Sequence, residues 1–94
     1  MAGFTFGKLW QAAKGDIVTV NGTKFKVEKV DSFDPEDNHE EKTKEIFLAP
    51  AQKGMEGEYL IELSDSLRSF YRIEQPDSFT NKKVEIPIEN ISPE

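Results

Sequence analysis

The stretch IVTVNGTKFKV, residues 17–27, decides how this chain folds. Two runs of alternating apolar and polar residues flank its central Asn21-Gly22 dipeptide. Such a dipeptide favours a two-residue hairpin turn, because both central positions of a type I′ turn need positive φ and Asn and Gly tolerate it best. The stretch therefore predicts an antiparallel β-hairpin.

The turn fixes the register of the hairpin, and the hydrophobic pattern gives an independent check of that register. A two-residue loop pairs Val20 with Thr23 and Val18 with Phe25. Successive side chains point to opposite faces of a strand, so one face collects the apolar side chains Val18, Val20, Phe25 and Val27. A sheet with one apolar face must be covered by a second layer.

Further strand patterns follow the hairpin. The apolar phase changes between Val27 and Val30, which predicts a β-bulge near Glu28-Lys29. The later segments with strand patterns are residues 46–49, 59–63, 71–73 and 84–88. Pro87 cannot donate a hydrogen bond to a ladder, so the last segment is expected at an edge of the sheet.

A short helix is predicted before the hairpin. Phe6, Leu9, Trp10 and Ala13 recur at helical spacing, and Gly15 can supply a left-handed cap, which indicates a helix over about residues 5–14. Two turns of helix are not stable alone, so we expect this helix to cover the apolar face of the hairpin or to plug an end of a barrel.

The segment over residues 34–44 is charged, contains a proline and has no apolar side chain, which predicts a mobile acidic loop. Phe33 is expected to be the last core contact before this loop. Taken together, these patterns predict one all-β domain over residues 1–94, a five- or six-stranded antiparallel barrel with a short N-terminal helix.

Composition narrows the classes of function. The chain has a net charge of −6 and no cysteine, so disulfides and thiolate metal ligands are excluded. Nucleic-acid binding depends on neutralising phosphates with Lys and Arg, and an acidic balance disfavours it. No apolar run approaches the roughly 20 residues of a membrane helix, and no signal-peptide pattern opens the chain, so we expect a cytoplasmic protein.

No catalytic motif is present. His39 is the only histidine, and neither a nucleophile elbow nor a phosphate-binding glycine loop occurs. The acidic loop holds many oxygen donors, but it lacks the glycine and the spacing of a calcium loop, so a solvated loop is the favoured interpretation. We predict that the protein is not an enzyme and uses no metal or other cofactor.

One group of residues and one single tryptophan are candidates for binding a partner. Arg68, Tyr71 and Arg72 combine guanidinium groups with an aromatic ring, a set that can stack bases and contact phosphates. The alternative is that Tyr71 is a core residue and the arginines are ordinary strand charges. Trp10 would mark a partner site if exposed, and would be a core residue if packed.

The segment from Val20-Asn21-Gly22-Thr23-Lys24-Phe25 to Ser32-Phe33-Asp34-Pro35-Glu36-Asp37-Asn38 resembles the first motif of the Sm proteins. That motif has a Gly turn, a bent strand, a Phe-Asp pair and an Asn shortly after. The resemblance implies an SH3-like or Sm-like small β-barrel in which Asp34 and Asn38 would bind a uridine base.

Two functions from different classes stay open at this level. The first is a non-enzymatic interaction module that binds a protein or peptide partner, with residues 84–88 as an edge strand for strand addition. The second is an Sm-like protein that binds single-stranded RNA through Asp34, Asn38, Arg68, Tyr71 and Arg72. The sequence specifies neither a partner nor an oligomeric state.

Overall fold

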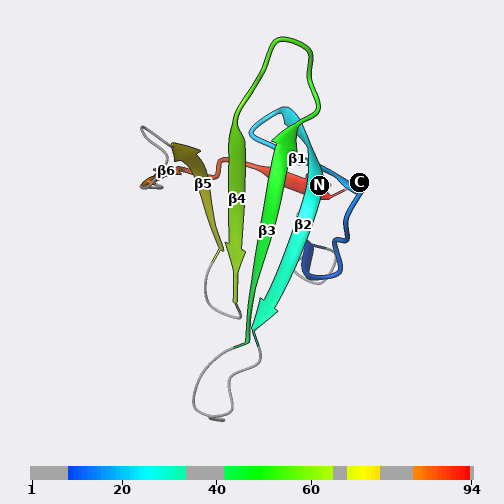
Figure 1. Ribbon diagram of the computed structural model, residues 1–94, viewed down its shortest axis with the longest axis vertical. Coiled ribbons are helices and arrows are strands. Elements are labelled where there is room, and N and C mark those ends of the chain that lie inside the picture. The colour runs from blue at the N-terminus through cyan, green and yellow to red at the C-terminus, as the bar shows by residue number, and fades with distance from the viewer. Residues whose placement is uncertain (1–8, 34–41, 65–67, 75–81, 94) are drawn as a thin grey trace.

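The computed structural model describes residues 9–33, 42–64, 68–74 and 82–93. All strands in these ranges belong to one antiparallel sheet (Figure 1). They are β1 (Ile17–Val20), β2 (Thr23–Phe33), β3 (Thr43–Pro50), β4 (Glu58–Leu63), β5 (Arg68–Glu74), β6 (Lys82–Ile86) and β7 (Ile91–Pro93). The predicted all-β, antiparallel architecture is confirmed. The strands β1 to β6 follow the predicted segments, and β7 adds a short strand beside β1.

The β1–β2 hairpin has the predicted turn and register. Asn21 and Gly22 have φ values of 51° and 81°, as a type I′ turn requires. Val20 pairs with Thr23 and Val18 with Phe25. The hairpin prediction is confirmed in both turn and register.

The predicted bulge in β2 is also present. Val27 pairs with Leu48, whereas the next partners are Lys29 and Phe47, so Glu28 is the extra residue. The bulge shifts the phase by one position, because a second residue on β2 stands against a single residue of β3. Residues that follow it face inward at even numbers, and Val30 packs against the core.

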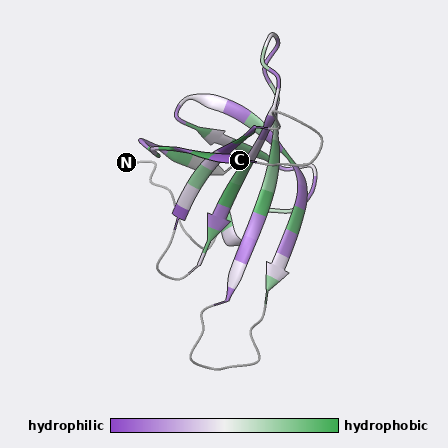
Figure 2. Cartoon of the chain, turned by 60° about the vertical axis from the view of Figure 1, so that its left-hand side comes forward, coloured by the Kyte–Doolittle hydropathy of each residue, from purple (hydrophilic) through white to green (hydrophobic). Residues whose placement is uncertain are grey.

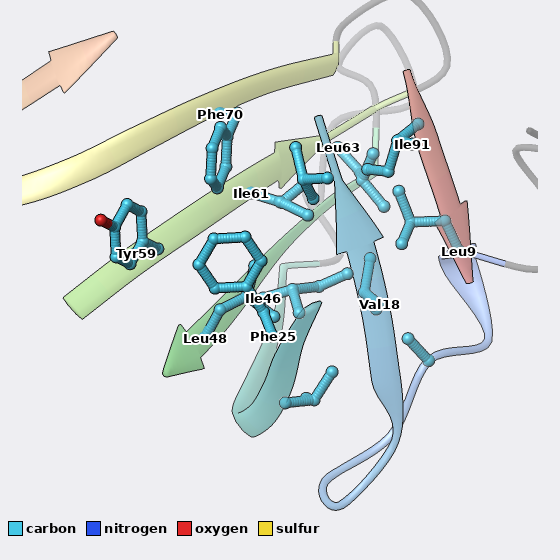
Figure 3. Packing of buried hydrophobic residues seen from close by; sticks show 13 residues of the cluster. Leu9, Val18, Phe25, Ile46, Leu48, Tyr59, Ile61, Leu63, Phe70 and Ile91 are labelled. Carbon is cyan, nitrogen blue, oxygen red and sulfur yellow. The ribbon is translucent and has the colours of Figure 1, made fainter. Parts of the chain in front are cut away.

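The sheet curls so that its apolar face closes on itself. Phe25 on β2 and Phe70 on β5 have ring centroids 5.6 Å apart, although β3 and β4 lie between their strands. Three strand spacings in a flat sheet would separate them by about 14 Å. Tyr59 on β4 completes this aromatic group, with its ring stacked on Phe70 at 5.6 Å (Figure 3). The curl thus replaces the second layer that a flat sheet would need.

The predicted barrel closure is wrong. β6 and β7 form the two edges of the sheet, and no ladder joins these two described strands. Both edges carry a proline that lacks an N–H donor, Pro87 directly after β6 and Pro93 within β7. The sheet is therefore strongly curled and open, and a short connection spans the gap between its edges.

Asn21 holds that connection to the hairpin turn. Its backbone N–H donates to the Asn90 carbonyl at 2.8 Å, and its side-chain Nδ2 donates to the Pro87 carbonyl at 2.9 Å. Its Oδ1 accepts from the backbone N–H groups of Glu89, at 2.7 Å, and Asn90, at 3.1 Å. We call these four hydrogen bonds the Asn21 clamp. They satisfy backbone groups that no ladder could pair.

The helix prediction over residues 5–14 is wrong for its second half, and residues 5–8 lie outside the described ranges. Of the described residues 9–14, only Leu9 and Trp10 have helical backbone. The Ala13 N–H donates to Asp16 Oδ2 at 2.9 Å, and Gly15, with φ of 97°, donates to the Val27 carbonyl at 2.8 Å. The chain turns here because bonds to the hairpin replace bonds that would continue a helix. Leu9 is fully buried in the core, as expected of a residue that covers the apolar face.

The C-terminal end of the predicted acidic loop belongs to a strand. Of the predicted acidic loop over residues 34–44, residues 34–41 lie outside the described ranges, and β3 begins at Thr43. Among the residues that the structure describes, no helix has the length and apolar character needed to cross a membrane.

Replacing Asn21 with glycine tests the clamp. Asn21→Gly keeps a backbone that tolerates positive φ but removes three side-chain hydrogen bonds. We expect the free energy of unfolding to fall by about 2 kcal/mol, because a net hydrogen bond contributes about 0.5–1.5 kcal/mol. Urea denaturation measures this loss, and hydrogen exchange at the Glu89 and Asn90 amides should accelerate. A variant of unchanged stability and unchanged exchange would show that the clamp is dispensable.

Candidate functional site

The outer face of the sheet, opposite the core, is neither uniformly polar nor uniformly charged. Hydrophilic and hydrophobic residues alternate along the strands (Figure 2), as expected where the two faces of a sheet differ in polarity, and the exceptions lie in one row. One cross-strand row on this face runs through Lys29, Phe47, Leu60 and Tyr71. Leu60 is only 1% exposed, although it is not part of the core cluster of the inner face. The outer face thus carries an apolar band of its own.

Lysines flank this band on both sides. Lys29 Nζ lies 5.3 Å from the centroid of the Phe47 ring, and Lys83 Nζ lies 5.6 Å from that of Tyr71. These are cation–π distances, at which an ammonium group is attracted to the ring face. Both rings therefore already interact with a cation of this chain.

A cavity of about 390 Å³ opens at one end of the outer face. It is lined by Phe33, Thr43, Lys44, Glu45, Glu62 and Leu63. Phe33 is 54% exposed, so its prediction as a core contact is wrong. The bulge at Glu28 is the cause: because it shifts the phase of β2, Val30 turns inward and Phe33 turns outward. The bulge is thus the sequence signal that could have located this site.

The cavity is acidic. Asp31, Glu45 and Glu62 stand opposite one another on β2, β3 and β4. Like charges directly opposite each other across strands destabilise a sheet. Ion pairs with lysines offset this repulsion at two of the three carboxylates. Lys29 Nζ lies 3.3 Å from Asp31 Oδ2, and Lys83 Nζ lies 3.1 Å from Glu62 Oε2.

Glu45 is the exception in this row: no other described residue forms a hydrogen bond or ion pair with it, and Lys83 acts on it only as a longer-range Coulombic partner. Lys44, its neighbour on β3, does not compensate it. The Lys44 ammonium donates to the Trp10 carbonyl at 2.6 Å and lies 4.7 Å from the centroid of the Trp10 ring. The cavity therefore combines an exposed aromatic ring with a carboxylate open to a cation from outside.

The predicted binding residues do not form one site. Alternation along β5 places Tyr71 on the outer face and Arg68 and Arg72 on the side of Phe70, at the two ends of the inner face. Arg72 is exposed and forms an ion pair with Glu74, whose hydrogen bond raises the pKa of Arg72 further. Tyr71 therefore cannot act together with both arginines on one surface.

The other predicted binding residues are Trp10, Asp34 and Asn38. Trp10 is half-buried and packs against the core, which agrees with its interpretation as a packing residue. Asp34 and Asn38 lie outside the described ranges. Within the described ranges, no three His, Cys, Asp or Glu side chains form a group that could hold a metal ion.

Comparisons with protein-family models, with curated proteins and with solved structures gave no match for this chain.

Two substitutions on the outer face distinguish an exposed candidate binding residue from a buried residue that stabilises the fold. Phe33→Ser should change the free energy of unfolding by less than about 0.5 kcal/mol, because an exposed side chain contributes little to folding. Leu60→Ser should cost about 3 kcal/mol, since it removes a buried apolar group and buries a hydroxyl. Thermal and urea unfolding of both variants check this. A large loss in Phe33→Ser would show that its ring is part of the packing.

Alkaline pH should weaken the contact between Lys83 and Glu62. The hydrogen bond to Glu62 raises the pKa of Lys83 above its ordinary 10.5, and desolvation partly opposes it. A raised folded-state pKa stabilises fully at lower pH and loses that effect as pH rises through the folded pKa. The unfolding free energy of the wild type should exceed that of Glu62→Gln by about 0.5 kcal/mol at neutral pH, because exposed pairs contribute little. This difference should be lost as the pH rises through the folded-state pKa of Lys83, which lies above 10.5. A difference independent of pH would exclude the charge of Lys83 as its cause.

Proposed function

We propose that this chain is a non-enzymatic interaction module that binds an extended, basic segment of a partner protein on the outer face of β2, β3 and β4. The observation that carries the proposal is the exposed Phe33 ring at a 390 Å³ cavity beside Glu45. Exposed aromatic side chains in cavities are typical anchors of protein interfaces.

A lysine or arginine side chain suits this cavity chemically. Its apolar stem can pack on Phe33, its charge can pair with Glu45, and its cation can lie over an aromatic ring. The net charge of −6 also attracts a basic partner over a longer range and speeds encounter.

A second cavity indicates how the segment would run. It measures about 300 Å³, and Phe47 and Ala49 line it together with Lys29 and Glu58. Glu45 and Ala49 are four residues apart on β3, which is about 13 Å along a strand. An extended peptide along β3 would place a basic side chain in the first cavity and, about four residues on, an apolar one in the second.

Single-stranded RNA is the rival ligand, which the resemblance to Sm proteins suggests. It would use Asp34, Asn38, Arg68, Tyr71 and Arg72. Tyr71 lies on the face opposite to both arginines, so β5 offers RNA no single binding surface. RNA binding is therefore the alternative outcome of the test below.

The test is an NMR titration with short extended peptides that carry Lys and Leu four residues apart. We expect shifts at Phe33, Glu45 and Phe47, with affinity at least about tenfold lower for a peptide in which Ala replaces Lys. Phe33→Ser and Glu45→Gln should each weaken binding similarly. Glu56→Gln is the matched control, because it makes the same charge change at an exposed position away from the cavity.

Two results would contradict the proposal. One is an absence of peptide shifts at low salt. The other is binding of an unstructured oligonucleotide with shifts centred on Arg68 and Arg72 that fade as salt rises, because counterion release drives phosphate binding. The second result would favour the RNA-binding function instead.

A further inference from the structure

The edge of the sheet at β6 offers a second surface, distinct from the outer-face cavity. Among the described strands, β6 pairs only with β5. Alternate residues of an antiparallel edge strand point their N–H and C=O groups away from the sheet, which is a template for another strand. The opposite edge, β7, is only three residues long and includes Pro93.

The sequence of β6, KKVEI, is complementary to itself when read antiparallel. Centred on Val84, a second copy places Glu85 opposite Lys83 and Lys83 opposite Glu85. Val84 then meets Val84 of the second copy on the two-fold axis. Opposite charges directly across strands stabilise a sheet, and this register makes two such pairs.

Neighbouring registers are disfavoured by the same residues. A two-fold axis through the edge keeps the outer faces of both copies on one side, so outer residues must oppose outer residues. A register centred on Lys83 sets Lys83 against its own copy, and one centred on Glu85 sets Glu85 against its own copy. Both place like charges opposite each other, which destabilises the pairing. The charges of β6 therefore select the register at Val84.

Contacts within one chain support this arrangement. Lys83 and Glu85 are exposed on the outer face, while Val84 is half-buried on the inner side. Lys83 is held above the sheet by Glu62 at 3.1 Å and by the Tyr71 ring. It is thus positioned before a second strand arrives, which lowers the entropy lost on pairing.

We propose that β6 pairs antiparallel with β6 of a second copy of this chain, in a two-fold dimer with the register centred on Val84. Pro87 directly follows the strand and ends the pairing, since it has no N–H to donate. The interface is isologous, so each copy uses its β6 edge once and the assembly stops at two. Because only five residues pair, the dimer is weak and depends on concentration.

The test exchanges the charges of the edge. Sedimentation velocity is measured from about 20 µM to about 1 mM protein, a range suited to a weak interface. Lys83→Glu and Glu85→Lys should each weaken dimerisation by about tenfold or more, because two attractive pairs become repulsive. The double variant Lys83→Glu with Glu85→Lys should restore it. All variants carry Glu62→Gln, so that Lys83→Glu creates no carboxylate pair within one chain.

Glu62→Gln alone is the control: it loses the contact that positions Lys83 but keeps both Lys83–Glu85 pairs, so it should still dimerise, and every charge variant is compared with it. Isotope-filtered NOEs between copies should connect the two Val84 residues. A chain that stays monomeric up to the highest concentration would overturn the proposal, as would single variants that dimerise normally or a double variant that fails to recover. None of these readouts involves peptide binding at Phe33, so the two proposals can fail separately.

Discussion

The structure depends on the short connection between its two edge strands. β6 and β7 lie at opposite edges of the sheet, yet Ile86 and Ile91 are only five residues apart in sequence. Five residues span at most about 18 Å, whereas seven strands laid flat would be about 29 Å wide. The short connection therefore requires the sheet to curl, and the Asn21 clamp fixes where that connection sits. The aromatic group of Phe25, Tyr59 and Phe70 fills the space that the curl creates.

Local signals in the sequence predicted local structure well. The Asn21-Gly22 turn, its register and the bulge after Val27 all follow from φ preferences and from the two-residue period of a strand. Closure of the sheet could not be predicted in this way, since it depends on backbone bonds between residues far apart in sequence. The helix prediction failed for the same reason, because the Gly15 N–H donates to the Val27 carbonyl instead of capping a helix.

The prediction for Phe33 was wrong because the effect of the bulge continues along the whole of β2. The bulge was predictable, but its effect on every later residue of β2 has to be followed to the end of the strand, where it turns Phe33 outward. Glu45 and Glu62 belong to segments far apart from Phe33 in the sequence, and only the pairing of β2, β3 and β4 brings them together. Charge composition indicates an acidic protein, but the order of the strands is needed to see that Lys83 on β6 reaches Glu62 on β4 across β5.

β1 has one partner that is close in the chain and one that is very distant. Its pairing with β2 needs only a two-residue loop, and isolated hairpins of this kind form in about 1–10 µs. Its pairing with β7, and the bond from Asn21 to Pro87 across 66 positions, must wait until the intervening strands have assembled. Asn21 therefore forms the first turn and also binds the segment that docks last. We expect folding to begin with the turn at Asn21 and to end with the hydrogen bond from Asn21 to Pro87.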